Sequence, residues 1–394
     1  MKRSYPVLMF AFIFTMAAVS LPVNGEEVAI HGFISQGFLK TDQNNYLADT
    51  DEGSFQFNEM GINFTTFVAS DLKVGCQFFA RDLGDVGNDE IVVNWAFAEY
   101  TFRNWLGLRT GIIKKPFGFY NDIRDFDSLR APIFLPSSVY NEWLRDGLDK
   151  LKGIEFFGAI EMGGLGLLEY QLQTGINPVA LDSGSAKYIT EIVAGGLDTM
   201  SLMESDTSYI ARLVWTTPLD GLRFGATYHN TGFYYEGDKD LSPALLDVSI
   251  TVDGGSDLYI FSGEYAYGNL KIAAENYWTI GDTTSTIFIP GMAPIIKKGD
   301  IDNKKPYYIS LGYRFTEWFE ASFYYSDYNG GDNDAGDVNE LTDQCLSLRF
   351  DINPSWTAKL EAHVMDGEYG VSADDDGHTY SEWMLYAAKL SYSF

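Results

Sequence analysis

The chain has 394 residues and a formal net charge of −28, with 55 acidic and 27 basic side chains. This excess of acid excludes nucleic acid as a partner, because its phosphates would be repelled. The composition is rich in Gly (39), Phe (28) and Tyr (25) but has only 2 Cys, which excludes a small secreted domain held by disulfides. Cys76 and Cys345 are far apart in the strand order derived below, so we expect no bridge between them.

The N-terminus has the features of a secretory signal peptide. Lys2 and Arg3 form a positive start, an apolar stretch runs over 7–21, and small residues follow at 23–25. We expect residues 1–25 to be a signal peptide and residues 26–394 to form the mature protein outside the cytoplasm. No other segment has the ~18–20 continuous apolar residues that a helical membrane span needs.

Hydrophobicity in the rest of the chain alternates with a period of two. In segment 307–315 one face carries Tyr, Ile, Leu, Tyr and Phe, and the other carries mostly polar or small residues. Segments 222–228 and 356–364 follow the same rule. Strict alternation over such lengths indicates β-strands rather than helices.

Short turns and long polar loops separate these segments in strict alternation. Seven turns and eight loops give sixteen strands, with both termini on the side of the turns. The turns lie at 69–71, 102–105, 163–164, 218–221, 267–269, 316–318 and 353–355. The loops lie near 42–53, 83–89, 119–151, 178–206, 237–255, 282–304, 330–341 and 367–380.

This pattern predicts an all-β fold: a transmembrane antiparallel β-barrel of about 16 strands, with short periplasmic turns and long extracellular loops. The sheet must close into a barrel, because in lipid every backbone N–H and C=O needs a partner within the protein and an open sheet would leave those of its edge strands unpaired. We therefore expect a bacterial outer-membrane protein in contact with lipid and lipopolysaccharide. Tryptophans support this reading as members of two aromatic girdles, at the turn side (Trp105, Trp215, Trp318, Trp356) and at the loop side (Trp278, Trp383).

The last strand ends in a large aromatic residue. Tyr392 and Phe394 share a face with Met384, Tyr386 and Leu390, and this face would point into lipid. We expect Phe394 to close the barrel against the first strand, near 28–39. The ending resembles the C-terminal signal of bacterial outer-membrane barrels, and this resemblance implies recognition by the barrel-assembly machinery.

A sixteen-stranded barrel is wide enough to hold an aqueous channel. By strand phase, basic and acidic side chains that face inward nearly balance, so most of the negative charge must lie in the loops. The inward bases are Arg81, Arg109, Lys115, Arg212, Arg223, Lys271, Arg314, Arg349, Lys359 and Lys389, and the acids are Glu59, Glu99, Glu169, Glu264, Glu275, Glu320, Asp351 and Glu361.

The loop at 119–151 differs from the others because it is apolar as well as charged. It contains Phe119, Phe126, Phe134 and Trp143 beside several acids and bases. Loops this long are usually functional or disordered, and this one is too apolar for disorder. We expect it to fold into the lumen and narrow the channel. An ordinary packed extracellular loop is the alternative.

Residues 111–118 (GIIKKPFG) and the loop after them resemble the fifth strand and third loop of bacterial porins, most closely the phosphate-selective group; residues 78–82 (FFARD) are also porin-like. The local motifs cover about 74–135. The resemblance implies a homotrimer and places Lys115, Arg124 and Arg130 near the constriction, with Arg109 on the wall. Since the lining is mixed in charge, phosphate selectivity is not carried over.

We therefore predict a porin that lets small hydrophilic solutes or ions diffuse passively, with weak selectivity. A barrel that acts as a sheath, scaffold or adhesin for a partner is the alternative. We expect no enzyme, no cofactor and no metal, because the four histidines are scattered and no nucleophile motif is present. The residues predicted to line the pore or its constriction are Arg81, Glu99, Arg109, Lys115, Asp122, Arg124, Asp125, Asp127 and Arg130.

Overall fold

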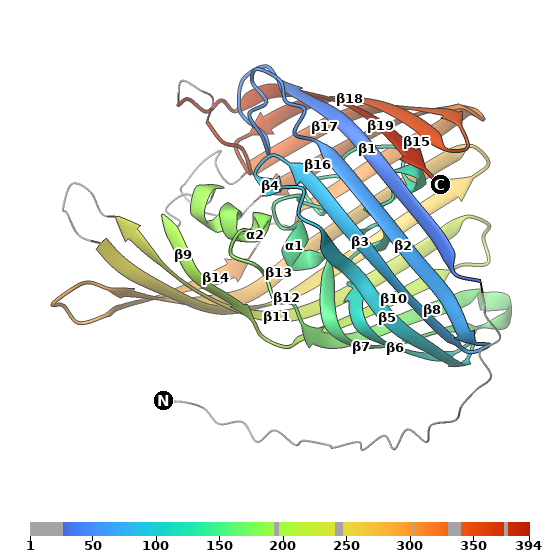
Figure 1. Cartoon of the computed structure of the whole chain (residues 1–394), viewed down its shortest axis with the longest axis horizontal. Helices are drawn as coiled ribbons and strands as arrows, with labels where there is room; N and C mark the ends of the chain where they lie inside the picture. Colours follow the sequence, from blue (N-terminus) through green and yellow to red (C-terminus); the bar gives the residue numbers. More distant parts are fainter. Residues whose placement is uncertain (1–26, 193–196, 241–246, 303–304, 330–339, 374–376) are drawn as a thin grey trace.

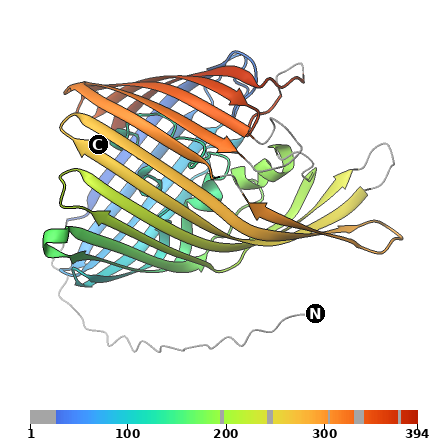
Figure 2. The same ribbon diagram turned by 180° about the vertical axis from the view of Figure 1, so that it is seen from behind.

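The computed structural model describes residues 27–192, 197–240, 247–302, 305–329, 340–373 and 377–394. They form one antiparallel sheet that closes on itself, because β1 pairs with both β2 and β19 (Figures 1 and 2). The sixteen wall strands are β1 (Ala29–Thr41), β2 (Asn58–Ala69), β3 (Leu72–Leu83), β5 (Val92–Arg103), β6 (Leu106–Lys114), β7 (Lys150–Glu161), β8 (Leu167–Ile176), β10 (Ser208–Thr216), β11 (Leu222–Asp240), β12 (Asp247–Tyr267), β13 (Leu270–Phe288), β15 (Tyr307–Thr316), β16 (Phe319–Asn329), β17 (Glu340–Asn353), β18 (Trp356–Gly367) and β19 (Glu382–Ser393).

The predicted barrel class is confirmed, and each of the seven predicted turns joins two neighbouring strands. Glycine makes two of these turns tight. Gly221 has φ +81° and Gly268 has φ +59°, a backbone region that residues with a Cβ rarely occupy. Turn chemistry therefore located the strand ends correctly on this side of the barrel.

Two of the predicted loops are wrong, because the strands continue through them. β11 runs to Asp240 and β12 begins at Asp247, inside the loop predicted at 237–255. β13 runs to Phe288 and β14 covers Ile295–Asp302, inside the loop predicted at 282–304. These ends project beyond the rest of the barrel (Figure 1). They are rich in Asp, Gly, Ser and Thr and so resemble polar loops, although Val248, Ile250 and Val252 of β12 still alternate with polar residues.

Short strands also occur inside two other predicted loops. β9 (Thr199–Ser205) pairs with the end of β11, within the loop predicted at 178–206. β4 (Val86–Gly87) pairs with the end of β3, within the loop predicted at 83–89. Both extend the sheet of the wall without adding a wall strand.

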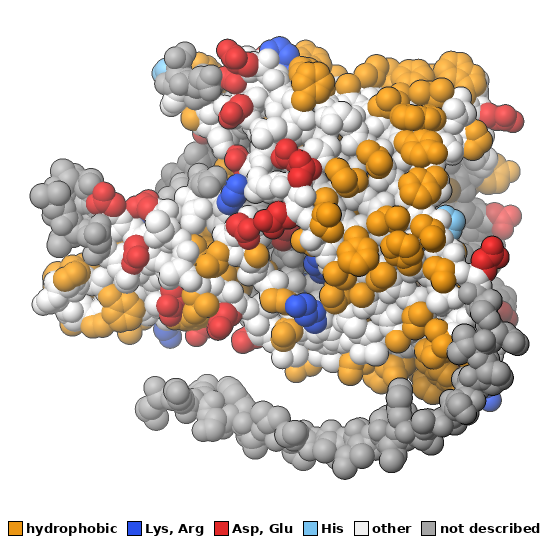
Figure 3. Space-filling model, viewed as in Figure 1, with side chains coloured by type: hydrophobic (Ala, Val, Ile, Leu, Met, Phe, Trp, Pro, Cys, Tyr) orange, Lys and Arg blue, Asp and Glu red, His pale blue; other side chains and the backbone are white. Residues whose placement is uncertain are grey.

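The outer surface of the barrel is apolar. Phe78, Phe156, Leu213 and Leu311 are each more than 40% exposed, and orange side chains cover much of the face in Figure 3. Such a belt on a closed barrel places the protein in a bacterial outer membrane. Beside the short turns, exposed aromatic residues include Trp105, Trp215, Phe315, Trp318 and Trp356.

Trp383 does not belong to a girdle, contrary to the prediction. It is 2% exposed and its Nε1 donates a hydrogen bond to the Gly367 oxygen at 3.1 Å. On β19 it shares its phase with Leu385 and Lys389, whose side chains are also buried, while Tyr386 and Leu390 are exposed. Trp383 therefore faces the interior.

The barrel closes at a seam between β1 and β19. The Gly32 N–H donates to the Phe394 oxygen at 3.1 Å, and the Phe394 N–H donates to the Gly32 oxygen at 3.0 Å. Cys76 and Cys345 are both free, as expected. In the described ranges, no helix is long and apolar enough to cross a membrane. The predicted signal peptide at 1–25 and most of the predicted loop at 330–341 lie outside the described residues.

Candidate functional site: the loop inside the barrel

Residues 115–149 connect β6 to β7, and we call them the inner loop. Pro116 ends β6, since proline has no N–H for the sheet. The loop contains the short helices η1 (Asn121–Ile123), η2 (Asp127–Leu129) and α1 (Arg145–Leu148). Its base is closed by a hydrogen bond from the Lys115 N–H to the Asp149 oxygen at 2.9 Å. Figures 1 and 2 show the loop, in green-blue, between the walls of the barrel.

The inner loop is anchored by two apolar clusters on opposite sides. Ile133, Phe134 and Trp143 pack with residues of β1, β19 and the loops above them. Phe119, Tyr120 and Tyr140 pack against the wall from β10 to β15. Polar contacts of the loop reach almost the whole circumference, to Arg212 (β10), Thr227 (β11), Glu264 (β12), Glu275 (β13), Tyr307 (β15), Ser326 (β16), Ser347 (β17), Lys359 (β18), Ser391 (β19), Glu59 (β2), Arg81 (β3) and Asn94 (β5).

One side of the loop carries interlocked ion pairs, which we call the ionic face. Arg145 lies at its centre. Its Nη1 is 2.9 Å from Glu59 Oε1 and 3.2 Å from Glu142 Oε2, and its Nη2 is 2.6 Å from Asp125 Oδ1. The other members of the ionic face are Arg81, Lys114, Arg124, Asp146, Asp149 and Lys389. Bases and acids are equal in number in this set, so little net charge is buried.

The ionic face holds its carboxylates in the charged form. Burial alone would raise the pKa of Asp125, but Lys114 and Arg145 lower it well below its usual value. Burial is likewise outweighed at Glu142, where Arg124, Arg145 and Arg81 lower the pKa. These acids remain ionised, and each ion pair is retained, at any neutral pH.

Asp127 fixes the middle of the loop to β18 and β19. Lys359 Nζ lies 3.0 Å from Asp127 Oδ1 and also donates to the backbone oxygens of Asp127 and Arg130, at 2.7 and 2.9 Å. Ser391 Oγ donates to Asp127 Oδ2 at 2.6 Å. Burial opposes the charge of Asp127, but Lys359, Lys389 and Arg130 lower its pKa. This anchor joins residues more than two hundred positions apart.

The opposite side of the loop is held by tyrosines, and we call it the tyrosine face. Tyr120 donates its hydroxyl to Glu264, and Tyr140 donates to Glu275. Glu275 also accepts the Tyr308 hydroxyl at 2.9 Å and the Phe119 N–H at 2.8 Å. Burial, and then the neighbouring carboxylates, raise the pKa of Tyr120 and Tyr140, so both phenols stay protonated.

A third group of charges lines the wall below the loop. Arg109 forms ion pairs with Glu99 at 2.5 Å and Glu155 at 2.6 Å. Its guanidinium lies between the rings of Phe97 and Phe157, 4.9 Å from each centroid. Arg212 reaches the loop at Asp122, with Nη2 2.6 Å from Oδ2.

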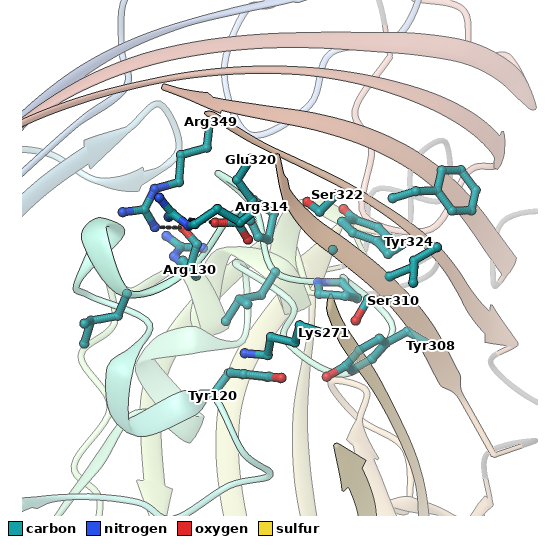
Figure 4. A pocket seen from close by; sticks show the side chains of 18 of the residues that line it. Tyr120, Arg130, Lys271, Tyr308, Ser310, Arg314, Glu320, Ser322, Tyr324 and Arg349 are labelled. Atoms are coloured by element: carbon teal, nitrogen blue, oxygen red, sulfur yellow. Dashed lines mark hydrogen bonds and ion pairs between the residues drawn. The ribbon is translucent and has the colours of Figure 1, made fainter. Parts of the chain in front are cut away.

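Three cavities border the inner loop. A cavity of about 340 Å³ lies between the loop and β13–β17, with Arg130, Lys271, Arg314, Glu320 and Arg349 in its lining beside Tyr120 and Tyr308 (Figure 4). A second, of about 520 Å³, is lined by Arg109, Asp122, Arg212 and Arg223. Both also include residues next to the short turns. A third, of about 580 Å³, lies on the other side of the loop and includes Lys115, Asn177, Ser185 and His229.

The nine predicted pore residues fall into different surroundings. Arg81, Arg124 and Asp125 are buried in the ionic face, and Asp127 is buried against Lys359. Arg130, Asp122 and Arg109 line the two cavities on the turn side, and Glu99 pairs with Arg109. Lys115 is 2% exposed, and its Nζ donates to the Gly147 oxygen at 2.8 Å. The structure therefore does not gather the nine around one aperture.

Reasoning from the sequence missed several residues that hold the loop. Glu142, at the centre of the ionic face, and the tyrosines of the tyrosine face were not among the candidates. Glu264 and Glu275 were expected to face inward, but nothing in the sequence indicated that they accept hydrogen bonds from the loop. Their phase on β12 and β13 was the available signal.

No protein-family model matches this sequence, and no curated protein matches it by sequence. By structure, OmpT of Vibrio cholerae is similar over 95% of this chain and 99% of its own, with a TM-score of 0.58 and 11% identity. OmpF of Salmonella typhi, in a complex with daunomycin, is similar over 94% and 98%, with a TM-score of 0.57 and 13% identity. The outer-membrane channel DcaP of Acinetobacter baumannii is similar over 94% and 98%, with a TM-score of 0.52 and 11% identity.

These similarities establish the fold, which is that of the sixteen-stranded outer-membrane β-barrels. Two of the neighbours, OmpF and DcaP, belong to the porins and channels. The more specific resemblance to phosphate-selective porins stays a prediction.

Proposed function

We propose that this protein is a porin, a passive channel for small hydrophilic solutes and ions, in which the inner loop sets the bore. The observation that supports this is the position of the loop. It contacts the wall on opposite sides and has cavities on both its turn side and its loop side. A solute that crosses the barrel must pass between the loop and the wall.

Size exclusion and a local field would give the channel its weak selectivity. In the cavity of Figure 4, Arg314 pairs with Glu320 at 2.9 Å and with Asp351 at 2.8 Å, so bases and acids share the surface. A mixed lining favours neither ion sign strongly. Permeation by this route needs no chemical step and no cofactor.

A sheath around a partner is less well supported. It would need an empty lumen, and the inner loop occupies the lumen between β3 and β13. We also propose a homotrimer, on the porin resemblance and on the trimer form of Vibrio cholerae OmpT among the similar structures. Chemical cross-linking of the protein in native membranes tests the trimer; a monomer as the only product would contradict it.

Single-channel current in a planar bilayer, with a KCl gradient, tests the channel. We expect stable conductance steps, and we expect larger steps after deletion of residues 122–145. Deletion of residues 289–294, which join β13 to β14 away from the lumen, is the control and should leave the steps unchanged. Correctly folded protein without any conductance would overturn the proposal, and an unchanged step in the 122–145 deletion would show that the loop does not set the bore.

A further inference from the structure

A thiol, an imidazole and a carboxylate meet on the inner wall at β17 and β18. Cys345 and His363 are directly opposite each other in the register of the two strands, and Glu361 shares the inward face two residues before His363. Cys345 Sγ lies 3.7 Å from His363 Nε2, and Nε2 lies 3.3 Å from Glu361 Oε2. All three ligand atoms lie within 4.8 Å of one another, and all three side chains are buried.

Two of the three separations, from His363 Nε2 to Cys345 Sγ and to Glu361 Oε2, match the edges of a tetrahedral zinc site. With bonds of about 2.3 Å to sulfur and about 2.0–2.2 Å to nitrogen and oxygen, ligand atoms around Zn²⁺ are separated by roughly 3.3–3.6 Å. The two distances above differ from that range by about 0.1 Å at most. Thiolate, imidazole and carboxylate are the donors that Zn²⁺ takes in proteins.

A second observation independently points to a ligand. His363 Nδ1 lies 3.0 Å from Asp343 Oδ1, and the other oxygen of Asp343 accepts the Tyr324 hydroxyl at 2.8 Å. A carboxylate on one ring nitrogen fixes the tautomer and aims the other nitrogen at a metal, as the partners of metal-bound histidines do. Here the other nitrogen, Nε2, points at Cys345 and Glu361.

We propose that Cys345, Glu361 and His363 form a Zn²⁺ site on the lumen wall. Zn²⁺ would replace the thiol proton and any proton on Nε2, while Nδ1 keeps its proton for Asp343. Glu361 links the site to the inner loop, because its Oε1 accepts the Ile133 N–H at 2.6 Å and its Oε2 accepts the Phe134 N–H at 3.2 Å. A metal here would therefore tie β17 and β18 to the loop.

A protonated His363 between Asp343 and Glu361 is the competing explanation of the same contacts. It accounts for the distances from both ring nitrogens to the carboxylates, and the Nε2–H would be shared between Glu361 and the sulfur of Cys345. The two explanations differ in what the sulfur does. With zinc the sulfur is a thiolate bonded to the metal, and without zinc it is a thiol.

The test uses Co²⁺, whose bond to a thiolate gives an absorption band in the near ultraviolet. The whole protein carrying Cys76→Ser is refolded with Co²⁺ present, because the site is buried. Cys76 lies on β3, four strands from β18 around the wall, and shares the outward phase of the exposed Phe78. Its substitution is therefore the matched control, and any thiolate band comes from Cys345. We expect one Co²⁺ per chain with a thiolate band, competed by Zn²⁺.

Adding Cys345→Ser should abolish the band, and adding His363→Gln should reduce Co²⁺ binding at least tenfold. Heat-modifiable migration on a gel shows whether each variant is folded. Folded Cys76→Ser protein that gives no thiolate band would overturn the site. That outcome is decisive even where Cys345→Ser does not fold, because it depends on the control protein alone.

Discussion

The two faces of the inner loop are held by different physics. On the ionic face, Arg145 is shared by three carboxylates that are themselves shared by other bases. On the tyrosine face, neutral phenols donate to Glu264 and Glu275, and each glutamate has further partners, so the loss of one phenol leaves neither carboxylate without a contact. Removing one member of the ionic face leaves several buried charges unpaired, whereas the tyrosine face can open one hydrogen bond at a time.

This difference indicates where the loop can move. The ionic face fixes the loop to β2, β3 and β6, and the tyrosine face lies beside the cavity of Figure 4. A solute on the proposed route passes between the loop and the wall. Moving the loop away from the wall costs less free energy at the tyrosine face than at the ionic face. The predictions below run from the largest expected effect to the smallest.

Arg145→Met should weaken the protein most, because it leaves Glu59, Asp125 and Glu142 short of a partner in a buried site. Breaking a buried ion pair costs about 3–5 kcal/mol, and we expect a loss of that size in the free energy of unfolding, measured by urea titration in lipid vesicles. Arg103→Met, at the exposed end of β5, is the control. A loss no larger than that of the control would show that the ionic face does not hold the loop.

Glu275→Gln should affect conductance more than stability. The amide removes the charge that accepts Tyr140, Tyr308 and the Phe119 N–H, which costs about 1.5–3 kcal/mol, while the ionic face stays intact. We expect larger or noisier current steps in single-channel recordings. Glu382→Gln, on the exposed outer face at the start of β19, should leave the steps as they are. Equal steps in both variants would mean that the tyrosine face is not the moving side.

Alkaline pH should stabilise the base of the loop. Burial lowers the pKa of Lys115 to about 8, with Asp149 opposing, while an unfolded lysine titrates near pH 10.4. The folded protein therefore binds this proton more weakly than the unfolded chain, so the free energy of unfolding rises between pH 8 and 10. Lys115→Met should remove that rise, and Lys297→Met, on exposed β14, should not. The measurement is a set of urea titrations at fixed pH values.

Mild acid should change nothing on the ionic face. The folded pKa values of Asp125, Asp127 and Glu142 are lowered, so their contribution is complete above the unfolded pKa of about 4 and is lost only as pH falls through the folded values. Protease protection of the inner loop should be equal at pH 7 and pH 5. Cleavage within 122–145 at pH 5 alone would contradict this assignment of charge.

Most of the barrel could be predicted from the sequence, because contact with lipid and the geometry of tight turns each restrict which residues can occupy a short stretch of the chain. Alternation placed the inward residues, Gly221 and Gly268 marked turns, and the apolar residues of the inner loop distinguished it from the other long loops. The extensions of β11 to β14 were missed because they are rich in Asp, Gly, Ser and Thr, as loops are; the alternation of Val248, Ile250 and Val252 with polar residues was the available signal. The contacts of the loop could not be found either. Lys359 and Asp127 come into contact only because the barrel closes around the loop, and no pattern of neighbouring residues predicts a contact between positions so far apart in the sequence.

The seam at Gly32 and Phe394 also orders events in time. Every other pair of wall strands joins neighbours along the chain, so those pairs can form as soon as both strands exist. The β1–β19 pair instead joins segments some 350 residues apart and requires the largest loss of chain entropy. Until it forms, the sheet has two open edges whose N–H and C=O groups can pair with other chains. The slow and vulnerable stage in the folding of this protein is therefore the time before the seam closes, when the two edges need protection, rather than the formation of the strands.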